Sequence, residues 1–144
     1  MLLGEYEHTI DEKNRLTLPA RFRKELAGGL VVTRGLDRCL VAFPRESWQE
    51  NVRGRLSVLD PLHEETRKMR RFFFANATEA EPDKQGRVMI PPALLRHASL
   101  TRDVVVAGMD DHLEIWDRAA WREHLTEIEG SAEHVAERLA SGRG

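Results

Sequence analysis

The chain has 144 residues, enough for one ordinary domain or two very small ones. Hydrophobic residues make up 41% and charged residues 32%, as is usual for soluble globular proteins. No apolar run reaches the ~18 residues of a membrane span, and the first residues lack a signal peptide's basic start and apolar core. We therefore expect a cytoplasmic protein with no membrane partner. The single cysteine, Cys39, cannot form an internal disulfide and lies in an apolar run typical of a core.

The net charge of −2 is unevenly distributed along the chain. Residues 1–75 contain 14 Lys and Arg against 11 Asp and Glu, whereas residues 76–144 contain 8 against 13. From Lys13 to Lys24 there are five cations and no acid. Because a phosphate group responds to the local electrostatic field, the negative net charge of the chain does not exclude nucleic-acid binding. Taken alone, however, such a stretch is more typical of a solvated surface than of a DNA site.

An internal repeat organises the chain. The segment Asp11-Glu-Lys-Asn-Arg15-Leu-Thr-Leu-Pro19 aligns with Asp83-Lys-Gln-Gly-Arg87-Val-Met-Ile-Pro91 at an offset of 72 residues. With one residue inserted, the match resumes at an offset of 73 and aligns residues 30–40 with 103–113 and Trp48 with Trp121. Ordered matches at a nearly constant offset indicate two copies of one unit.

The pattern predicts the same succession of elements in each copy. In the first copy we expect a hairpin of strands 5–10 and 15–18 around a charged turn, a short helix from Pro19, and a second hairpin over 30–33 and 39–43. In the second copy we expect strands near 77–81, 87–90, 103–107 and 112–116, with a short helix from Pro92.

Each copy ends in an amphipathic helix. Trp48, Val52 and Leu56 recur every four residues, and so do Trp121 and Leu125. At this spacing the tryptophans are expected to pack in the core, the alternative being a platform on which bases stack. The tail from Ser131 is expected to add a helix through Leu139 and then to fray.

A linking helix is expected between the copies, after Pro61. Leu62, Met69 and Phe72 mark its apolar face. It also carries a group of cations that we interpret first as a solvated surface near the helix C-terminus and second as a phosphate contact. These cations are Arg67, Lys68, Arg70 and Arg71.

A unit of about 45 residues buries too little surface to be stable alone, so the two copies are expected to share a core. We predict an α+β, mainly β fold in which the duplicated unit forms an interleaved β-barrel, an intrachain pseudo-dimer, with flanking amphipathic helices. The expected parts are a first domain over 5–47, a helical linker over 48–75, a second domain over 76–119, and a C-terminal helix and tail over 120–144.

The two Asp-x-x-x-Arg turns are the strongest candidates for function. An arginine at a turn can donate two hydrogen bonds to a guanine edge or a phosphate, while the aspartate accepts from turn amides and supports the loop. The alternative is that each pair is only an ion pair within its loop. Cations are denser around Arg15 than around Arg87, so we expect the first copy to dominate contact with DNA. The candidate DNA-binding residues are Lys13, Asn14, Arg15, Arg21, Arg23, Lys24, Lys84 and Arg87, with Asp11 and Asp83 supporting the turns.

The doubled Asp-x-x-x-Arg-φ-x-φ-Pro pattern, followed in each copy by an apolar hairpin and a tryptophan helix, resembles the MraZ family of transcription regulators. The resemblance runs from Gly4 to about Glu129. It implies two fused SpoVT/AbrB-like swapped-hairpin domains. It also implies a nucleoid-associated homo-oligomer, a ring, that binds repeated DNA boxes upstream of the cell-division and cell-wall gene cluster, including its own promoter. The first turn has Asn14 where the second has Gly86, a mild departure, because Asn tolerates a left-handed backbone.

Three other functions are alternatives to DNA-binding regulation. For an enzyme, the six histidines lack a ligand-like spacing, and Asp110-Asp111-His112 fits a turn better than a metal site. No nucleophile elbow, phosphate loop or dinucleotide fingerprint is present. We therefore expect no catalytic residues, metal, cofactor or small-molecule substrate. An AbrB-like antitoxin module and a purely structural ring protein remain as alternatives.

Overall fold

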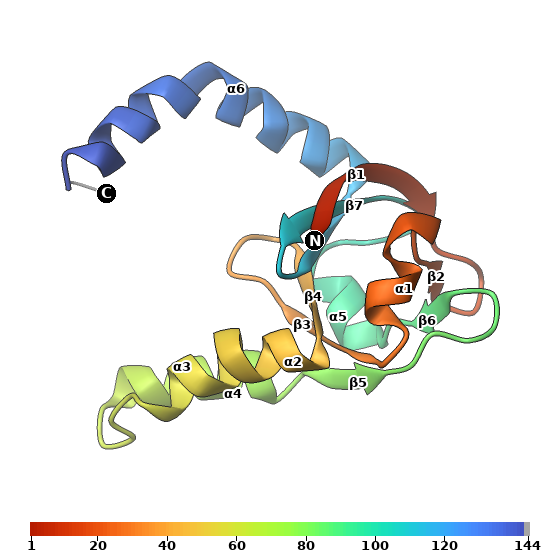
Figure 1. The fold of residues 1–144 in the computed structure, drawn as a ribbon, viewed down its shortest axis with the longest axis horizontal. Helices are drawn as coiled ribbons and strands as arrows, with labels where there is room; N and C mark the ends of the chain where they lie inside the picture. The colour runs from red at the N-terminus through yellow and green to blue at the C-terminus, as the bar shows by residue number, and fades with distance from the viewer. Residues whose placement is uncertain (143–144) are drawn as a thin grey trace.

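The two copies follow one another along the chain, but their strands are interleaved in space (Figure 1). The computed structural model describes residues 1–142. The strands are β1 (Leu2–Thr9), β2 (Arg15–Thr17), β3 (Leu30–Arg34), β4 (Leu40–Pro44), β5 (Thr78–Ala80), β6 (Arg87–Met89), β7 (Asp103–Asp110) and β8 (Leu113–Asp117). The helices are a 3-10 turn (Ala20–Phe22), α1 (Arg23–Leu26), α2 (Arg45–Trp48), a π-helical segment (Gln49–Arg53), α3 (Gly54–Ser57), α4 (Glu64–Phe74), α5 (Pro92–His97) and α6 (Arg118–Ala140).

Six strands form one antiparallel sheet in the order β1-β7-β8-β4-β3-β5, and β2 pairs with β6 in a separate two-stranded ribbon. The order is the same from either end when each strand is replaced by its counterpart in the other copy. The register agrees, since Val41 pairs with Glu114 at the offset of 73 and Leu16 pairs with Val88 at the offset of 72. The repeat is therefore a pseudo-two-fold axis in the structure, and it passes through the β4–β8 pair and through the ribbon.

The predicted hairpins of β1 with β2 and of β5 with β6 are wrong. β1 pairs with β7 and β5 pairs with β3, so each copy lends its first strand to the other copy's hairpin. One isolated bridge, Ile10 with Leu16, connects β1 with β2. Alternating polarity specifies a strand but not its partner, which is why the local pattern suggested the nearest one.

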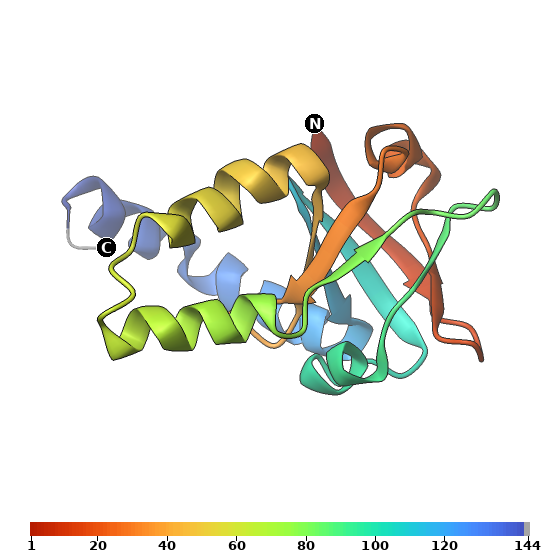
Figure 2. The same ribbon diagram turned by 90° about the horizontal axis from the view of Figure 1, so that it is seen from below.

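The mainly β, duplicated pseudo-dimer is confirmed, but the barrel is not closed. β1 and β5 are the edges of the large sheet, and the ribbon lies across it as a second layer (Figure 2). β2 and β6 are three residues long and bond to each other. Pro82, between β5 and β6, has no N–H to continue a ladder. The sheet and the ribbon therefore cover each other without joining into a barrel.

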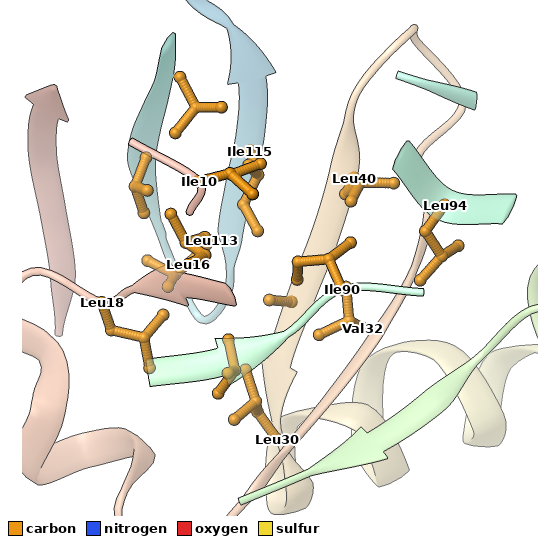
Figure 3. Close-up of a cluster of buried hydrophobic side chains, with 14 of the residues drawn as sticks. Ile10, Leu16, Leu18, Leu30, Val32, Leu40, Ile90, Leu94, Leu113 and Ile115 are labelled. Atoms are coloured by element: carbon orange, nitrogen blue, oxygen red, sulfur yellow. The ribbon is translucent and has the colours of Figure 1, made fainter. Parts of the chain in front are cut away.

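The main core lies between the large sheet and the ribbon (Figure 3). Leu16 and Leu18 come from the first copy's ribbon segment, and Ile90 comes from the second copy. They meet Leu40 and Leu113 from the two central strands, and all five are fully buried. Each such side chain contributes about 1.5–3 kcal/mol when buried, so neither copy keeps this stabilisation without the other.

The predicted packing of the tryptophans among apolar residues is confirmed, but it takes place on the outer face of the sheet, in two clusters separate from the main core. Val52 and Leu56 are buried with Phe43, and the Trp48 ring packs edge-on against Phe43 at 6.0 Å. Trp121 is buried against other residues of the second copy. Cys39 is buried there too, and burial raises the pKa of its thiol far above its ordinary value.

Residues 45–74 form an arm that projects from the sheet (Figures 1 and 2). The predicted apolar face of α4 is confirmed at Phe72, whose ring packs against His97 and Arg34, but it is wrong at Leu62 and Met69. Leu62 precedes the helix and is 85% exposed, whereas Thr66, Phe73 and Phe74 lie against the first tryptophan helix or the adjoining sheet. Three consecutive phenylalanines allow more than one helical phase, so spacing did not identify the buried face.

Gly108 tests the exchanged strand pairing. A Cβ at this position would collide with the Leu2 and Leu3 backbone on β1. Gly108→Ala should therefore destabilise the fold by about 1–3 kcal/mol, whereas Gly28→Ala, where nothing lies within 4 Å, should change stability little. Urea unfolding of both variants measures the difference. Equal stabilities would contradict close β1–β7 packing at Gly108.

Candidate nucleic-acid interface

The two Asp-x-x-x-Arg turns have the same geometry. In the first turn (residues 11–14), Asp11 Oδ1 accepts from the N–H groups of Lys13 and Arg15, both at 2.9 Å, and its Oδ2 accepts from Arg15 Nε at 2.8 Å. In the second turn (residues 83–86), the same three bonds reach Asp83, each at 2.9 Å. Each aspartate therefore supports its turn, as predicted, and holds the arginine that follows.

The turn backbone explains the Asn–Gly difference between the copies. Asn14 has φ 60° and Gly86 has φ 76°, the left-handed conformation that these two residue types tolerate best. A Cβ at Gly86 would also collide with the Arg23 guanidinium. A larger residue at Gly86 would therefore have to displace the Arg23 side chain as well as adopt a left-handed backbone.

The turn hydrogen bonds lower the pKa of both aspartates. For Asp11 the largest cause is the bond from Arg15 N–H; burial acts in the opposite direction, and the Arg15 side chain and Lys13 N–H add to the lowering. Asp83 shows the same causes from Arg87 and Gln85. Both carboxylates are therefore charged at neutral pH and keep their arginines oriented.

The ribbon register places both arginines on one face. Arg15 pairs with Met89 and Thr17 pairs with Arg87, while Leu16 and Val88 between them point into the core. Paired residues share a face, so the outward side, which we name the ribbon face, consists of Arg15, Thr17, Arg87 and Met89. The two arginines are diagonal neighbours, with Cα atoms about 7–8 Å apart.

The arginines keep donors for a ligand. Within residues 1–142, each guanidinium bonds its aspartate through Nε alone, which leaves the terminal nitrogens for another acceptor. The side chains of Arg15 and Arg87 are 30% and 28% exposed. The intraloop ion pair and a DNA contact are therefore compatible, because one guanidinium can do both.

Both turns project from the same end of the molecule, away from the arm (Figures 1 and 2). They flank the ribbon, since Leu18 N–H donates to Gly86 O and Ile90 N–H donates to Asn14 O, each at 2.8 Å. The two turns and the ribbon face thus form one continuous surface.

Strand exchange redistributes the predicted cations between the turns. Arg23, from the first copy, lies over the second turn and donates from Nε to Leu18 O at 3.2 Å. Arg102, from the second copy, lines a hollow with Lys13 and Arg15 at the first turn. Each turn thus has three nearby cations, so the density seen along the sequence does not give one copy its own basic patch.

Most predicted site residues lie at or near this surface. Lys13 and Lys84 are exposed on the two turns, and Arg21 and Lys24 are exposed on the short helical segment after β2. Thr17, Met89 and Arg102 were missed. The alternation of outward and inward residues around Arg15 and Arg87 already indicated that Thr17 and Met89 share the face of the arginines. The position of Arg102 depends on strand exchange.

The other motifs are structural in the described chain. Asp110 has φ 70° and begins the β7–β8 turn, and the His112 ring stacks on Phe43 at 4.7 Å. Residues 1–142 contain no group of three or more His, Cys, Asp or Glu placed to hold a metal ion. In the same range, no helix combines the length and apolar character of a membrane span.

These features define a class, a duplicated domain with exchanged strands that presents paired Asp–Arg turns beside a two-stranded ribbon. The profile of the family described as "MraZ protein, putative antitoxin-like" matches residues 1–69 and 73–142. The chain belongs to the MraZ family.

Its relatives include proteins named transcriptional regulator MraZ. One from Roseiflexus castenholzii is 46% identical over 143 residues, or 99% of both chains. Those from Thermoanaerobacter sp. strain X514 and Moorella thermoacetica are 43% and 44% identical over 139 residues, or 96% of this chain.

Acid titration tests the turn geometry. The carboxyl groups of Asp11 and Asp83 should titrate below the ordinary value of 3.8. Because the folded pKa is depressed, the stabilisation is present above the unfolded value and is lost as the pH falls through the folded pKa. Carboxyl carbon NMR shifts measure both midpoints, and midpoints at or above 3.8 would contradict the turn hydrogen bonds.

Proposed function

We propose that this chain is a sequence-specific DNA-binding transcription regulator whose ribbon face and flanking turns contact duplex DNA. The observation that carries the proposal is the pair of diagonal arginines, Arg15 and Arg87, on one exposed face. A two-stranded ribbon fits the major groove, where arginine donates two hydrogen bonds to guanine O6 and N7. Lys13, Lys84, Arg23 and Arg102 then lie beside the turns for phosphate contact.

Preorganisation supports this role. A free arginine loses side-chain entropy when it is ordered on DNA, a cost of about 0.5–1.5 kcal/mol. Here the Nε bond to aspartate already restricts each guanidinium, while its terminal nitrogens remain available. The aspartate therefore orients the arginine before DNA arrives.

The proposal extends to the targets implied by the resemblance. The chain would act in the cytoplasm, on the nucleoid, at repeated boxes upstream of the cell-division and cell-wall gene cluster and at its own promoter. The relatives named transcriptional regulator MraZ support a regulatory role. An inert ring protein would not need both arginines on one exposed face. An AbrB-like antitoxin module would also bind DNA, but we expect it to have a toxin-binding tail where this chain has a second complete copy. Binding of purified protein to its own upstream DNA tests the proposal.

Arginine substitutions test the base contacts. Arg15→Ala and Arg87→Ala should each weaken specific binding by about 1–3 kcal/mol, the contribution of one bidentate contact. Arg15→Lys should retain attraction to phosphate but lose the planar fork, so binding should become less specific. Fluorescence anisotropy with operator and scrambled DNA measures both effects.

Arg38→Ala is the matched control, because Arg38 is exposed on the β3–β4 loop and lies outside the proposed surface. It should bind as the wild type does. Folded Arg15 and Arg87 variants with wild-type affinity would overturn the base-contact assignment.

Salt dependence tests how the copies share the phosphate contacts. We expect two double variants to reduce the slope of log K against log salt concentration by the same amount, about 2, because each phosphate contact releases about 0.9 counterion. They are Lys13→Ala/Arg102→Ala and Lys84→Ala/Arg23→Ala. These pairs group residues by turn rather than by copy. A larger change on removing Lys13, Arg21, Arg23 and Lys24 than on removing Lys84, Arg87, Arg96 and Arg102 would instead show that the first copy dominates.

We further propose that the chains assemble into a ring that engages several boxes at once. One ribbon face is a small surface, and joining several makes each later contact intramolecular. Affinity should rise about 10²–10⁴-fold as regularly spaced boxes are added to the DNA. Mass photometry of the free protein should show a closed oligomer. Titration of duplexes with one, two and three boxes should show that affinity rises with the number of boxes. A monomer that binds one box as tightly as three would contradict the ring.

A further inference from the structure

One large apolar side chain lies on the ribbon face. Met89 is 64% exposed and lies outside the hydrophobic clusters that residues 1–142 form. Strand residues that point to solvent are normally polar, as Arg15, Thr17 and Arg87 are on the same face. Single exposed apolar residues are common on protein surfaces, so the significance of Met89 depends on what surrounds it.

The ribbon register places Met89 directly beside Arg15. Ile90 N–H donates to Asn14 O at 2.8 Å, so these two residues form a hydrogen-bonded pair. Such pairs alternate with non-hydrogen-bonded pairs along an antiparallel ladder, and the next pair is Arg15 with Met89. Side chains are closest in a non-hydrogen-bonded pair, where the Cα atoms are about 4.5 Å apart. Any ligand that reaches the Arg15 guanidinium therefore also lies close to Met89.

Met89 breaks the symmetry of the ribbon face. The pseudo-two-fold axis relates Arg15 to Arg87 and Thr17 to Met89, both at an offset of 72 residues. The arginines are identical, whereas Thr17 is short with a hydroxyl group and Met89 is long and apolar. Two-fold symmetry in a protein matches two-fold symmetry in its DNA site. The two arginines alone would therefore accept a duplex equally well in either direction, and the Thr17–Met89 difference distinguishes the directions.

The major groove offers one apolar group to a side chain such as Met89. Base edges there present hydrogen-bond donors and acceptors, except for the C5-methyl group of thymine. A methionine is flexible and polarisable, so it adapts its shape to such a group. Successive bases of one strand are about 3.4 Å apart, comparable with the about 4.5–5.5 Å between the Cβ atoms of paired residues. When Arg15 binds a guanine, Met89 therefore reaches the neighbouring base pair.

We propose that Met89 is a specificity-determining residue that packs against the methyl group of a thymine in the base pair next to the guanine bound by Arg15. Thr17, its counterpart, is too short for the equivalent contact, so the chain binds its box in one direction. The inference rests on the proposed DNA contact of the ribbon face, and it names a base that this face distinguishes in addition to guanine.

Uracil substitution tests the methyl contact. Deoxyuridine lacks the thymine methyl group but keeps the O4 acceptor and the base pair. The probe is a single-box duplex from the DNA upstream of the chain's own gene, with deoxyuridine placed at one thymine at a time. The affinity of the wild type should fall about fourfold at one thymine next to a guanine, the factor expected for one buried methyl group. Fluorescence anisotropy measures each affinity.

Variants of Met89 assign the effect to this side chain. Met89→Ser should bind the thymine and uracil duplexes equally, whereas Met89→Leu, which keeps a long apolar side chain, should still prefer thymine. Leu36→Ser is the matched control, because Leu36 is 74% exposed on the β3–β4 loop and lies outside the ribbon face. It should prefer thymine as the wild type does. Circular dichroism should show that all three variants are folded, since both positions are exposed.

Thr17→Met tests the direction of binding, because it gives the ribbon face two methionines related by the pseudo-two-fold axis. The probe is a palindromic duplex that carries the thymine on both strands. Replacing both thymines with deoxyuridine should weaken the wild type about fourfold, because one chain uses only one of them. The same replacement should weaken Thr17→Met about 16-fold, since both methionines then lose a methyl contact.

Failure of this inference is distinguishable from failure of the proposed function. If the wild type binds its upstream DNA and Arg15→Ala weakens that binding, the ribbon face contacts DNA. Uracil substitutions without effect would then overturn the role of Met89 alone. So would an undiminished preference for thymine in Met89→Ser, which would assign the methyl group to another residue or to DNA shape. A wild type that does not bind this DNA specifically would overturn both proposals.

Discussion

Strand exchange between the two copies is the constraint on which the rest of the structure depends. β1 completes the hairpin of the second copy, β5 completes that of the first, and β2 and β6 pair with each other. This pairing encloses the common core. It also sets Arg15 and Arg87 diagonally on one face. If each copy paired within itself, the arginines would belong to separate hairpins, and no ribbon register would relate them.

The turns combine two requirements in one ion pair. Asp11 and Asp83 satisfy backbone donors that a tight turn leaves unpaired, and they also orient a guanidinium. An exposed ion pair contributes little to stability by itself. Its value here is positional, since it keeps a flexible side chain directed outward from a rigid ribbon. The same carboxylate, through its two oxygens, therefore links the folding of the turn to the orientation of the arginine offered to DNA.

The repeat in the sequence predicted much of this arrangement. Asp11–Pro19 and Asp83–Pro91 located both turns, and the tryptophan spacing identified the packed helices, because local polarity and turn chemistry are visible along the chain. Strand partners were not visible, since pairing over such distances depends on the whole core. For that reason Arg23 and Arg102 lie beside the opposite copy's turn.

Strand exchange also determines how the chain folds as it is synthesised. Leu2 pairs with Asp110 and Thr9 pairs with Asp103, so β1 has no partner strand until β7 has been synthesised. At a synthesis rate of about 5–20 residues per second, the backbone of β1 stays unpaired for roughly 5–20 s. Such long-range pairing makes folding slow and leaves strand edges open to wrong partners. Glu5, Glu7 and His8 place polar side chains along this unpaired strand. The charges of the two glutamates discourage its pairing with neighbouring nascent chains.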